Sequence, residues 1–280
     1  MIRATALFLG MVIATCPAAA HFQEIIPSVD VLPEGGAVTL DLVFTHPMSG
    51  GPAMAMARPA RFGMMRGGRV VDLSGTLAEK PADVRNAADA EMPVDARKPA
   101  DAEPTAPNAI GGATAWTATV DLAEPGAAVF FIEPQPYWEP AEGKSIVHYA
   151  KVVVDSWASG EGWDAMVGLP VEIEPLVRPT GLWTGNLFTG IVRKDGAPVP
   201  FAEIEVEYVN DGSVTAPNDA FLTQVIKADQ NGVFSYAMPR AGWWGFAALM
   251  DGDAPMAGPD GKPAPVELGA LIFVKTTDMK

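Results

Sequence analysis

The alternation of apolar and polar residues over short runs is the clearest pattern in the chain, and it is typical of β-strands with one buried face. In residues 38–46 the even positions are nearly all apolar and end at His46, which is therefore expected to face inward where Pro47 stops the strand. Residues 145–154 alternate in the same way, so His148 is also expected to face inward. Two further strands are predicted at 114–120 and 127–133.

The second half of the chain shows the same kind of pattern. Residues 171–180 predict a strand that runs into a linker, and a strict alternation of acidic and apolar residues predicts another strand at 203–208. The carboxylates of that strand are expected on one solvated face, namely those of Glu203, Glu205 and Glu207. Hairpin turns, in which glycine supplies a positive φ, are predicted at Asp195-Gly196 and Asn231-Gly232.

These strands predict an all-β protein of two domains. An N-terminal β-sandwich is expected over residues 21–178. It is followed by a small β-sandwich over 181–280, whose strands and turns resemble those of transthyretin-like and carboxypeptidase-regulatory domains. Residues 78–110 consist largely of Ala, Pro, Asp, Glu and Lys, and they predict a mobile surface insertion in the first domain.

Residues 1–20 predict a secretory signal peptide. They contain Arg3, an apolar run at 6–14, and small residues at Ala18 and Ala20. Cleavage after Ala20 would release the remaining chain into the periplasm. Because no later run reaches about 18 uninterrupted apolar residues, no membrane insertion is expected after cleavage.

The single cysteine, Cys16, lies within this predicted signal. An alternative interpretation takes residues 13–16 as a lipobox, but Thr15 is a poor residue before the modified cysteine. Cleavage at the alanines removes Cys16, so the processed chain is expected to have no disulfide although it is exported to an oxidising compartment.

The charge and the motifs exclude several classes of function. The chain has 19 Lys and Arg against 34 Asp and Glu, a formal net charge of −15, which disfavours nucleic acid or an anionic membrane surface as a partner. It contains no GxSxG, HExxH, P-loop or dinucleotide-binding motif. An enzyme is therefore not expected.

The histidines are the candidate chemistry. The chain has three, His21, His46 and His148, and signal cleavage would make the first of them the N-terminal residue. A free α-amine and the Nδ1 atom of one residue can close a six-membered chelate ring on Ni(II), Co(II), Cu(II) or Zn(II). Two inward imidazoles would raise the set to four nitrogens. A single histidine on an apolar strand face is more often a hydrogen-bonded core residue. Each histidine alone is therefore a weaker candidate ligand than the three together.

Methionines are frequent after His46. Their thioethers could bind a soft ion such as Cu(I), but the favoured interpretation is that they fill gaps in the core. Glu24 also remains open as an additional ligand. The methionines concerned are Met48, Met54, Met56, Met64 and Met65.

Five segments of the chain together resemble the NikK-type periplasmic component found with energy-coupling-factor nickel and cobalt uptake transporters. The resemblance implies a protein that binds Ni(II) or Co(II) as cargo and supplies a membrane metal-uptake permease, with His21, His46 and His148 as the ligands. It covers nearly all of the chain after residue 20 apart from the insertion. The segments are His21-Phe22-Gln23 with Ile25-Ile26-Pro27-Ser28, residues 44–48, residues 61–63, residues 148–154 and residues 181–186.

Two other functions fit the residues less well. An N-terminal histidine with a second imidazole is also the histidine-brace arrangement of copper chaperones and copper oxidases, so copper remains possible. The third interpretation is a structural or carbohydrate-binding sandwich whose histidines belong to the core. Because the three ligands precede residue 180, a fragment that ends there is expected to bind metal with near-native affinity if it folds.

Overall fold

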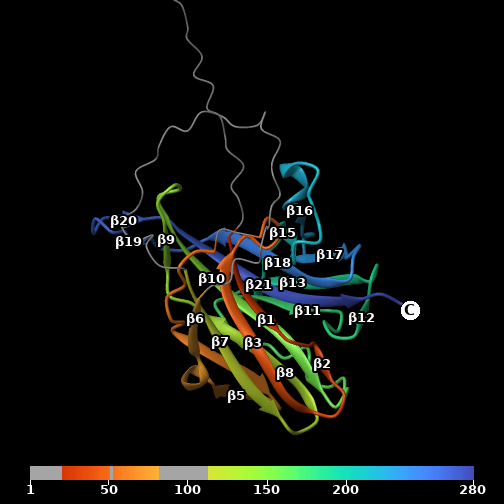
Figure 1. The fold of residues 1–280 in the computed structure, drawn as a ribbon. Helices are drawn as coiled ribbons and strands as arrows, with labels where there is room; N and C mark the ends of the chain where they lie inside the picture. Colours follow the sequence, from red (N-terminus) through yellow and green to blue (C-terminus); the bar gives the residue numbers. More distant parts are fainter. Residues whose placement is uncertain (1–20, 51–52, 82–112) are drawn as a thin grey trace, which may run out of the picture.

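A computed structural model describes residues 21–50, 53–81 and 113–280, so the predicted signal peptide and most of the predicted insertion lie outside the described residues (Figure 1). Within the described ranges the chain forms β-strands and two 3-10 helices, η1 (Ser74–Thr76) and η3 (Asp219–Phe221), with no α-helix. None of the described helices is long and apolar enough to cross a bilayer. The predicted all-β, sandwich-like class is confirmed.

A four-stranded antiparallel sheet contains the first strands of the described chain. Its order is β1 (Phe22–Pro27), β3 (Gly36–Thr45), β7 (Thr114–Leu122) and β6 (Ala78–Pro81). The alternation predicted for 38–46 holds in β3 up to Leu42, while Val43 and Thr45 are buried together with Phe44. Val38, Leu40, Leu42 and Phe44 all belong to the first core. The inner face of this sheet is therefore set by the even-numbered positions of β3.

An eleven-stranded sheet joins the two halves of the chain. Its middle pair is β21 (Val266–Thr277) and β10 (Lys144–Ser156), which run parallel and place Gly269 opposite His148. Figure 1 shows both strands passing through the middle of the molecule. On one side follow β18 (Gly242–Asp251), β15 (Glu203–Tyr208) and β16 (Gln224–Lys227), and on the other β8 (Gly126–Glu133), β4 (Arg61–Arg66) and β5 (Arg69–Asp72). The short strands β2 (Val31–Leu32), β9 (Tyr137–Glu139) and β12 (Leu182–Trp183) pair with β10 or β21.

The remaining strands form two smaller sheets. One consists of β11 (Val171–Pro175), β13 (Leu187–Lys194), β14 (Ala197–Pro198) and β17 (Val233–Ala237). The other is the pair β19 (Met256–Ala257) and β20 (Pro263–Ala264).

Two hydrophobic cores lie on opposite faces of the large sheet, because successive residues of a strand point to opposite sides. Leu271 and Phe273 of β21 pack into the core beneath the sheet of β1, β3 and β7. Ile272 and Val274 pack into the core shared with β11 and β13. The predicted boundary between residues 178 and 181 therefore separates two cores that share one continuous sheet, and the division into two domains stays a prediction.

The start of the predicted insertion is corrected by the structure. Residues Ala78–Pro81 form the edge strand β6, which pairs with β7, while residues 82–112 lie outside the described part. Lys80 of this strand forms an ion pair with Asp41, with 2.7 Å between nitrogen and oxygen. The strand was missed because its side chains are mostly exposed and show no apolar alternation.

Candidate metal centre

The pairing of β1 with β3 brings His21 and His46 together. Phe22 pairs with Thr45 in antiparallel register, so continuing the ladder by one residue sets His21 opposite His46. Directly opposed residues in an antiparallel pair project to the same face. The centroids of the two imidazole rings lie 4.5 Å apart. Two of the three predicted ligands are thus neighbours at the open end of the first sheet.

His148 reaches the same region from β10. Its side chain faces the core as predicted and is 2% exposed, and its ring centroid lies 6.3 Å from that of Phe44, the residue two positions before His46. A Cβ atom at Gly269, opposite it on β21, would come within 2.4 Å of the imidazole Cδ2. Glycine at this position therefore makes the space that the ring occupies.

The two nitrogens of His148 have different surroundings. Nε2 lies 3.1 Å from Oε1 of Glu267 on β21. Nδ1 is buried and has no hydrogen-bond partner among the described residues. A buried polar atom without a partner is rare in folded proteins and calls for an explanation such as an absent ion.

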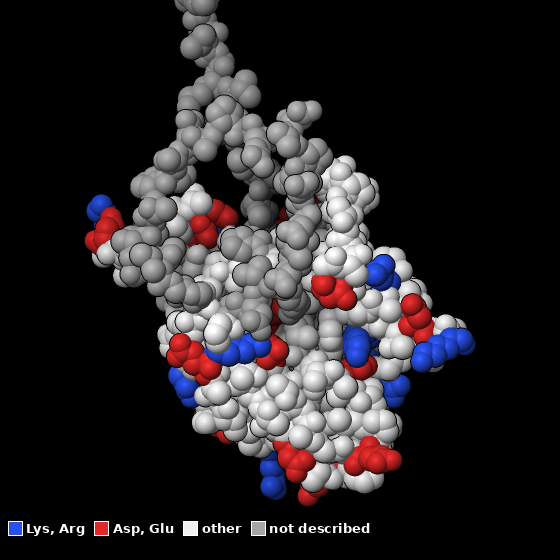
Figure 2. Space-filling model, in the orientation of Figure 1, with Lys and Arg blue, Asp and Glu red and all other residues white. Residues whose placement is uncertain are grey.

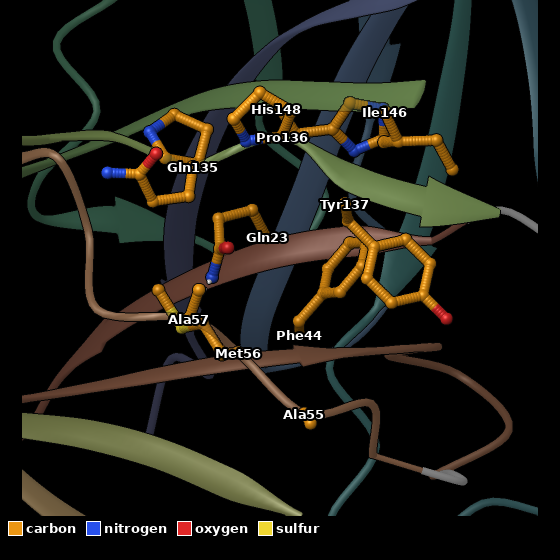
Figure 3. A pocket seen from close by; sticks show the side chains of 11 residues that line it. Gln23, Phe44, Ala55, Met56, Ala57, Gln135, Pro136, Tyr137, Ile146 and His148 are labelled. Carbon is orange, nitrogen blue, oxygen red and sulfur yellow. Dashed lines mark hydrogen bonds between the residues drawn. The ribbon is translucent and has the colours of Figure 1, made fainter. Parts of the chain in front are cut away.

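His148 lines a small pocket (Figure 3). Gln23, Phe44, Met56, Tyr137 and His148 are among the side chains that line it. The Gln23 amide nitrogen donates to the Val43 carbonyl oxygen and to the Met56 sulfur, both at 3.2 Å. Met56 is therefore already occupied by a hydrogen bond and packs in the core, as the favoured interpretation of the methionines predicted.

The surroundings of His21 lower the pKa of its ring. Burial lowers its pKa first, and the adjacent His46 and then His148 lower it further, while Glu139 acts in the opposite direction. The carboxylate Oε2 of Glu139 lies 3.3 Å from Nε2 of His21. Since a metal binds only the unprotonated nitrogen, a lowered histidine pKa favours metal binding near neutral pH.

Glu267 is an ionised acceptor at this site. Burial alone would raise its pKa, but the hydrogen bonds from His148 and Lys144 outweigh burial and lower the pKa to about 2. The Lys144 Nζ atom lies 2.5 Å from Oε2 of Glu267, so the two carboxylate oxygens contact different partners. The side chain is thereby fixed beside the His148 ring.

The turn after His46 is held by residues from the second half of the chain. The Met48 amide donates to Oε2 of Glu207 at 3.0 Å, and the Pro47 and Met48 carbonyl oxygens accept hydrogen bonds from Asn210 at 3.1 and 3.0 Å. These bonds span about 160 residues of sequence, since the Met48 and Asn210 bond has a separation of 162. The position of His46 consequently depends on the end of β15.

The expectation that Glu203, Glu205 and Glu207 form a solvated face is wrong for the last two. Glu207 is buried, and burial raises its pKa to about 7. Burial, and next the charge of Glu207, also raise the pKa of Glu205 to about 7. The alternation was correct, but the acidic face of β15 lies toward the first sheet rather than toward solvent.

No pattern along the chain pointed to Glu139 and Glu267, which contact His21 and His148. Glu139 lies on the short strand β9, which pairs with its sequence neighbour β10, whereas Glu267 lies on β21, whose partner β10 is distant in sequence. Among the described residues, no three His, Cys, Asp or Glu side chains are arranged to hold a metal ion as they stand. The His21 nitrogen is an amide in the full-length chain, so the predicted N-terminal chelate forms only after processing.

Charged side chains are scattered over the face shown in Figure 2, and no single basic patch gathers there among the described residues.

Comparison with known proteins identifies a family for this chain. The chain matches the model of a domain of unknown function, DUF4198, over residues 18–252. None of the curated proteins matches it.

Two solved structures show a weak likeness. One is the native conformation of E. coli alpha-2-macroglobulin, with 11% identity over 93% of this chain and 14% of that chain, at a TM-score of 0.25. The other is dimeric latent PorU from Porphyromonas gingivalis, with 7% identity over 90% of this chain and 20% of that chain, at a TM-score of 0.22. The chain thus spans a small part of each, and neither likeness bears on its function. The family match covers most of the sequence, and this protein belongs to the DUF4198 family of domains of unknown function.

Proposed function

We propose that this protein binds a divalent transition metal, nickel or cobalt, in the periplasm and delivers it to a membrane uptake permease. The proposal rests above all on the pairing of His21 with His46, whose ring centroids are 4.5 Å apart. The chain has only one other histidine, and that residue carries a buried nitrogen without a partner and lowers the pKa of His21. All three histidines therefore converge on one end of the first core.

The chemistry of these donors suits delivery rather than permanent storage. Neutral imidazoles and an amine are borderline ligands that accept Ni(II) and Co(II). No thiolate is available in the processed chain, because Cys16, the single cysteine of the full sequence, lies in the predicted signal peptide. Metal held by nitrogen donors in a site near the surface exchanges more readily than metal held by thiolates. The resemblance to NikK-type components supports the same assignment.

The N-terminal chelate provides the test. The signal-processed protein starts with His21, whereas a cytoplasmically produced protein that starts Met-His21 has an amide in place of the amine. We expect the extended protein to bind Ni(II) at least about tenfold more weakly, which corresponds to about 1.4 kcal/mol of lost coordination. Isothermal titration calorimetry on both proteins, after N-terminal sequencing, measures this difference.

The pH dependence gives a second readout on the same pair of proteins. Protons compete at an amine of pKa about 7.7, so binding to the processed protein should weaken as the pH falls from about 8. The extended protein should lack this step and should weaken only where its imidazoles protonate. Equal affinities and equal pH profiles would contradict an N-terminal chelate.

Metal analysis separates the other two functions. Protein purified from the periplasm should contain nickel or cobalt. Copper in its place would favour the histidine-brace alternative, although copper also wins many nitrogen sites on intrinsic affinity. Protein without transition metal, and unable to bind any added ion, would favour a structural sandwich whose histidines belong to the core.

A further inference from the structure

Each of two histidines has a carboxylate oxygen close to its Nε2 atom. Oε2 of Glu139 lies 3.3 Å from Nε2 of His21, and Oε1 of Glu267 lies 3.1 Å from Nε2 of His148. Both glutamates are well shielded from solvent, with side-chain exposures of 9% and 18%. In both histidines the carboxylate thus occupies Nε2, the nitrogen farther from the backbone.

We infer that His21 and His148 bind the metal through Nδ1, and that Glu139 and Glu267 are positioning residues which hold Nε2 in its protonated form. This inference rests on the proposed function and assigns the ligand atom of each ring.

The first step is the choice of tautomer. A carboxylate without a proton only accepts hydrogen bonds, so the imidazole nitrogen that faces it must carry the hydrogen. The neutral ring then has its lone pair on the other nitrogen, Nδ1. A carboxylate behind a metal-binding histidine commonly fixes both the tautomer and the ring orientation in this way. Glu267 acts so on His148 through a hydrogen bond, and the negative charge of Glu139, whose Oε2 lies 3.3 Å from Nε2 of His21, favours the same tautomer of His21.

The second step is an independent observation on each ring. For His148, the nitrogen that the tautomer leaves unprotonated is the buried Nδ1 that has no partner among the described residues. For His21, Nδ1 is the atom that can close a six-membered ring together with the α-amine after processing. The contact of Glu139 with Nε2 leaves that atom available. Two unrelated features therefore select the same nitrogen.

Glu267 is itself held by a partner that does not touch the histidine. Lys144 contacts Oε2 of Glu267, while His148 faces Oε1. Lys144 also pairs with Glu142, at 2.5 Å. Removal of Lys144 should therefore loosen the carboxylate but leave a hydrogen-bond acceptor for Nε2. Lys144→Gln should therefore weaken Ni(II) binding less than removal of the Glu267 carboxylate does.

Nuclear magnetic resonance tests the assignment directly. Signal-processed protein labelled with 15N-histidine is recorded before and after addition of Zn(II), a diamagnetic probe, in long-range proton–nitrogen correlation spectra. These spectra distinguish a protonated, an unprotonated and a metal-bound ring nitrogen. Before Zn(II), His148 should carry its proton on Nε2. With Zn(II), both His21 and His148 should show metal at Nδ1 and a proton at Nε2.

Three outcomes are separable. Metal at Nδ1 in both rings supports the inference, and metal at Nε2 in either ring overturns it while leaving the proposed function intact. No change at any histidine on addition of Zn(II), Ni(II) or Co(II) would overturn the proposed function and this inference together.

Variants then test the positioning role. We expect Glu267→Leu to weaken Ni(II) binding by about 10- to 100-fold, as loss of such a supporting group typically does. The Nε2-protonated preference of His148 should also be lost. Glu267→Gln retains an acceptor oxygen and should restore most of both properties. Glu203→Gln, on the same sheet but exposed, should change neither. If Glu267→Leu folds, binds Ni(II) normally and keeps the same His148 tautomer, the positioning role is wrong. If Glu267→Leu does not fold, Glu139→Leu provides the same test at His21.

Discussion

His148 carries an energetic cost that a core residue normally avoids. Its ring is 2% exposed, and Nδ1 lacks a partner among the described residues. A buried polar group without a hydrogen bond costs about 1 to 3 kcal/mol. An apolar side chain of similar size would remove this cost but would also forfeit the contact with Glu267. The residue is therefore expected to contribute little net stability, which fits the proposed role of a ligand better than that of a core residue.

This balance predicts the behaviour of His148→Leu. The free energy of unfolding should change by no more than about 1 kcal/mol, because the two effects oppose each other. Affinity for Ni(II) should fall at least about tenfold. Chemical denaturation and calorimetric titration measure the two quantities, and Gln135→Ala, at the rim of the same pocket, serves as the control. A large loss of stability with unchanged Ni(II) affinity would make His148 an ordinary core residue.

The sequence could predict the inward direction of the histidines but not their partners. Parity along 145–154 predicted that His148 is buried, and the structure confirms it, although residues of the opposite parity such as Lys151 are buried as well. The contacts of Glu139 and Glu267 depend on which strands become neighbours, and alternation within one strand carries no such information. The separation of 119 residues between His148 and Glu267 is bridged only by the parallel pairing of β10 and β21.

At the scale of elements, β15 shows both the strength and the limit of periodicity. The alternation at 203–208 predicts the strand with correct bounds, Glu203–Tyr208. It also suggests that the acidic face is wet, since antiparallel sheets often leave one face in solvent. The large sheet, however, is covered on both faces around β15, so Glu207 is buried and Glu205 is nearly so. In the same way, Gly232 has the predicted positive φ, yet the strands on either side of it pair with different neighbours and form no hairpin.

The raised pKa of Glu205 predicts a stability that depends on pH. Its folded value is about 7, above the ordinary 4.5, so between these values the native state binds a proton that the unfolded state has released. The contribution of Glu205 to the free energy of unfolding should therefore be fully present below about pH 4.5 and should be lost as the pH rises through about 7. We expect Glu205→Gln to raise the free energy of unfolding at pH 8 by on the order of 1 to 3 kcal/mol, with little effect at pH 4.5.

The matched control for this prediction lies on the same face of the same strand. Glu203 is 58% exposed at its side chain and pairs with the exposed Lys227, so Glu203→Gln should change stability little at either pH. Denaturant unfolding of the three proteins at pH 8 and pH 4.5 measures the difference. A Glu205→Gln curve that follows the Glu203→Gln curve at both pH values would mean that the Glu205 carboxylate is ionised without cost.

At the scale of the whole molecule, the predicted ligands and their supports come from different halves of the chain. The three predicted ligands, His21, His46 and His148, precede residue 180. Glu207 and Asn210, which hold the turn after His46, and Glu267, beside His148, all follow it. The all-β class and several of the longer strands could be predicted from local pattern. The sharing of one sheet between two cores could not, because it arises from pairing across the predicted domain boundary.

This arrangement reverses the expectation for a fragment that ends at residue 180. Such a fragment retains all three histidines but lacks β21, so β10 loses its parallel partner over eight residue pairs and the first core loses Leu271 and Phe273. We expect it neither to fold as a monomer nor to bind Ni(II), as measured by dispersion of amide resonances and by calorimetry. Supplying residues 181–280 as a separate chain should restore both, because the supports need proximity rather than covalent continuity. A fragment that folds alone and binds Ni(II) with near-native affinity would show instead that the ligands need neither the Glu207 and Asn210 contacts nor Glu267.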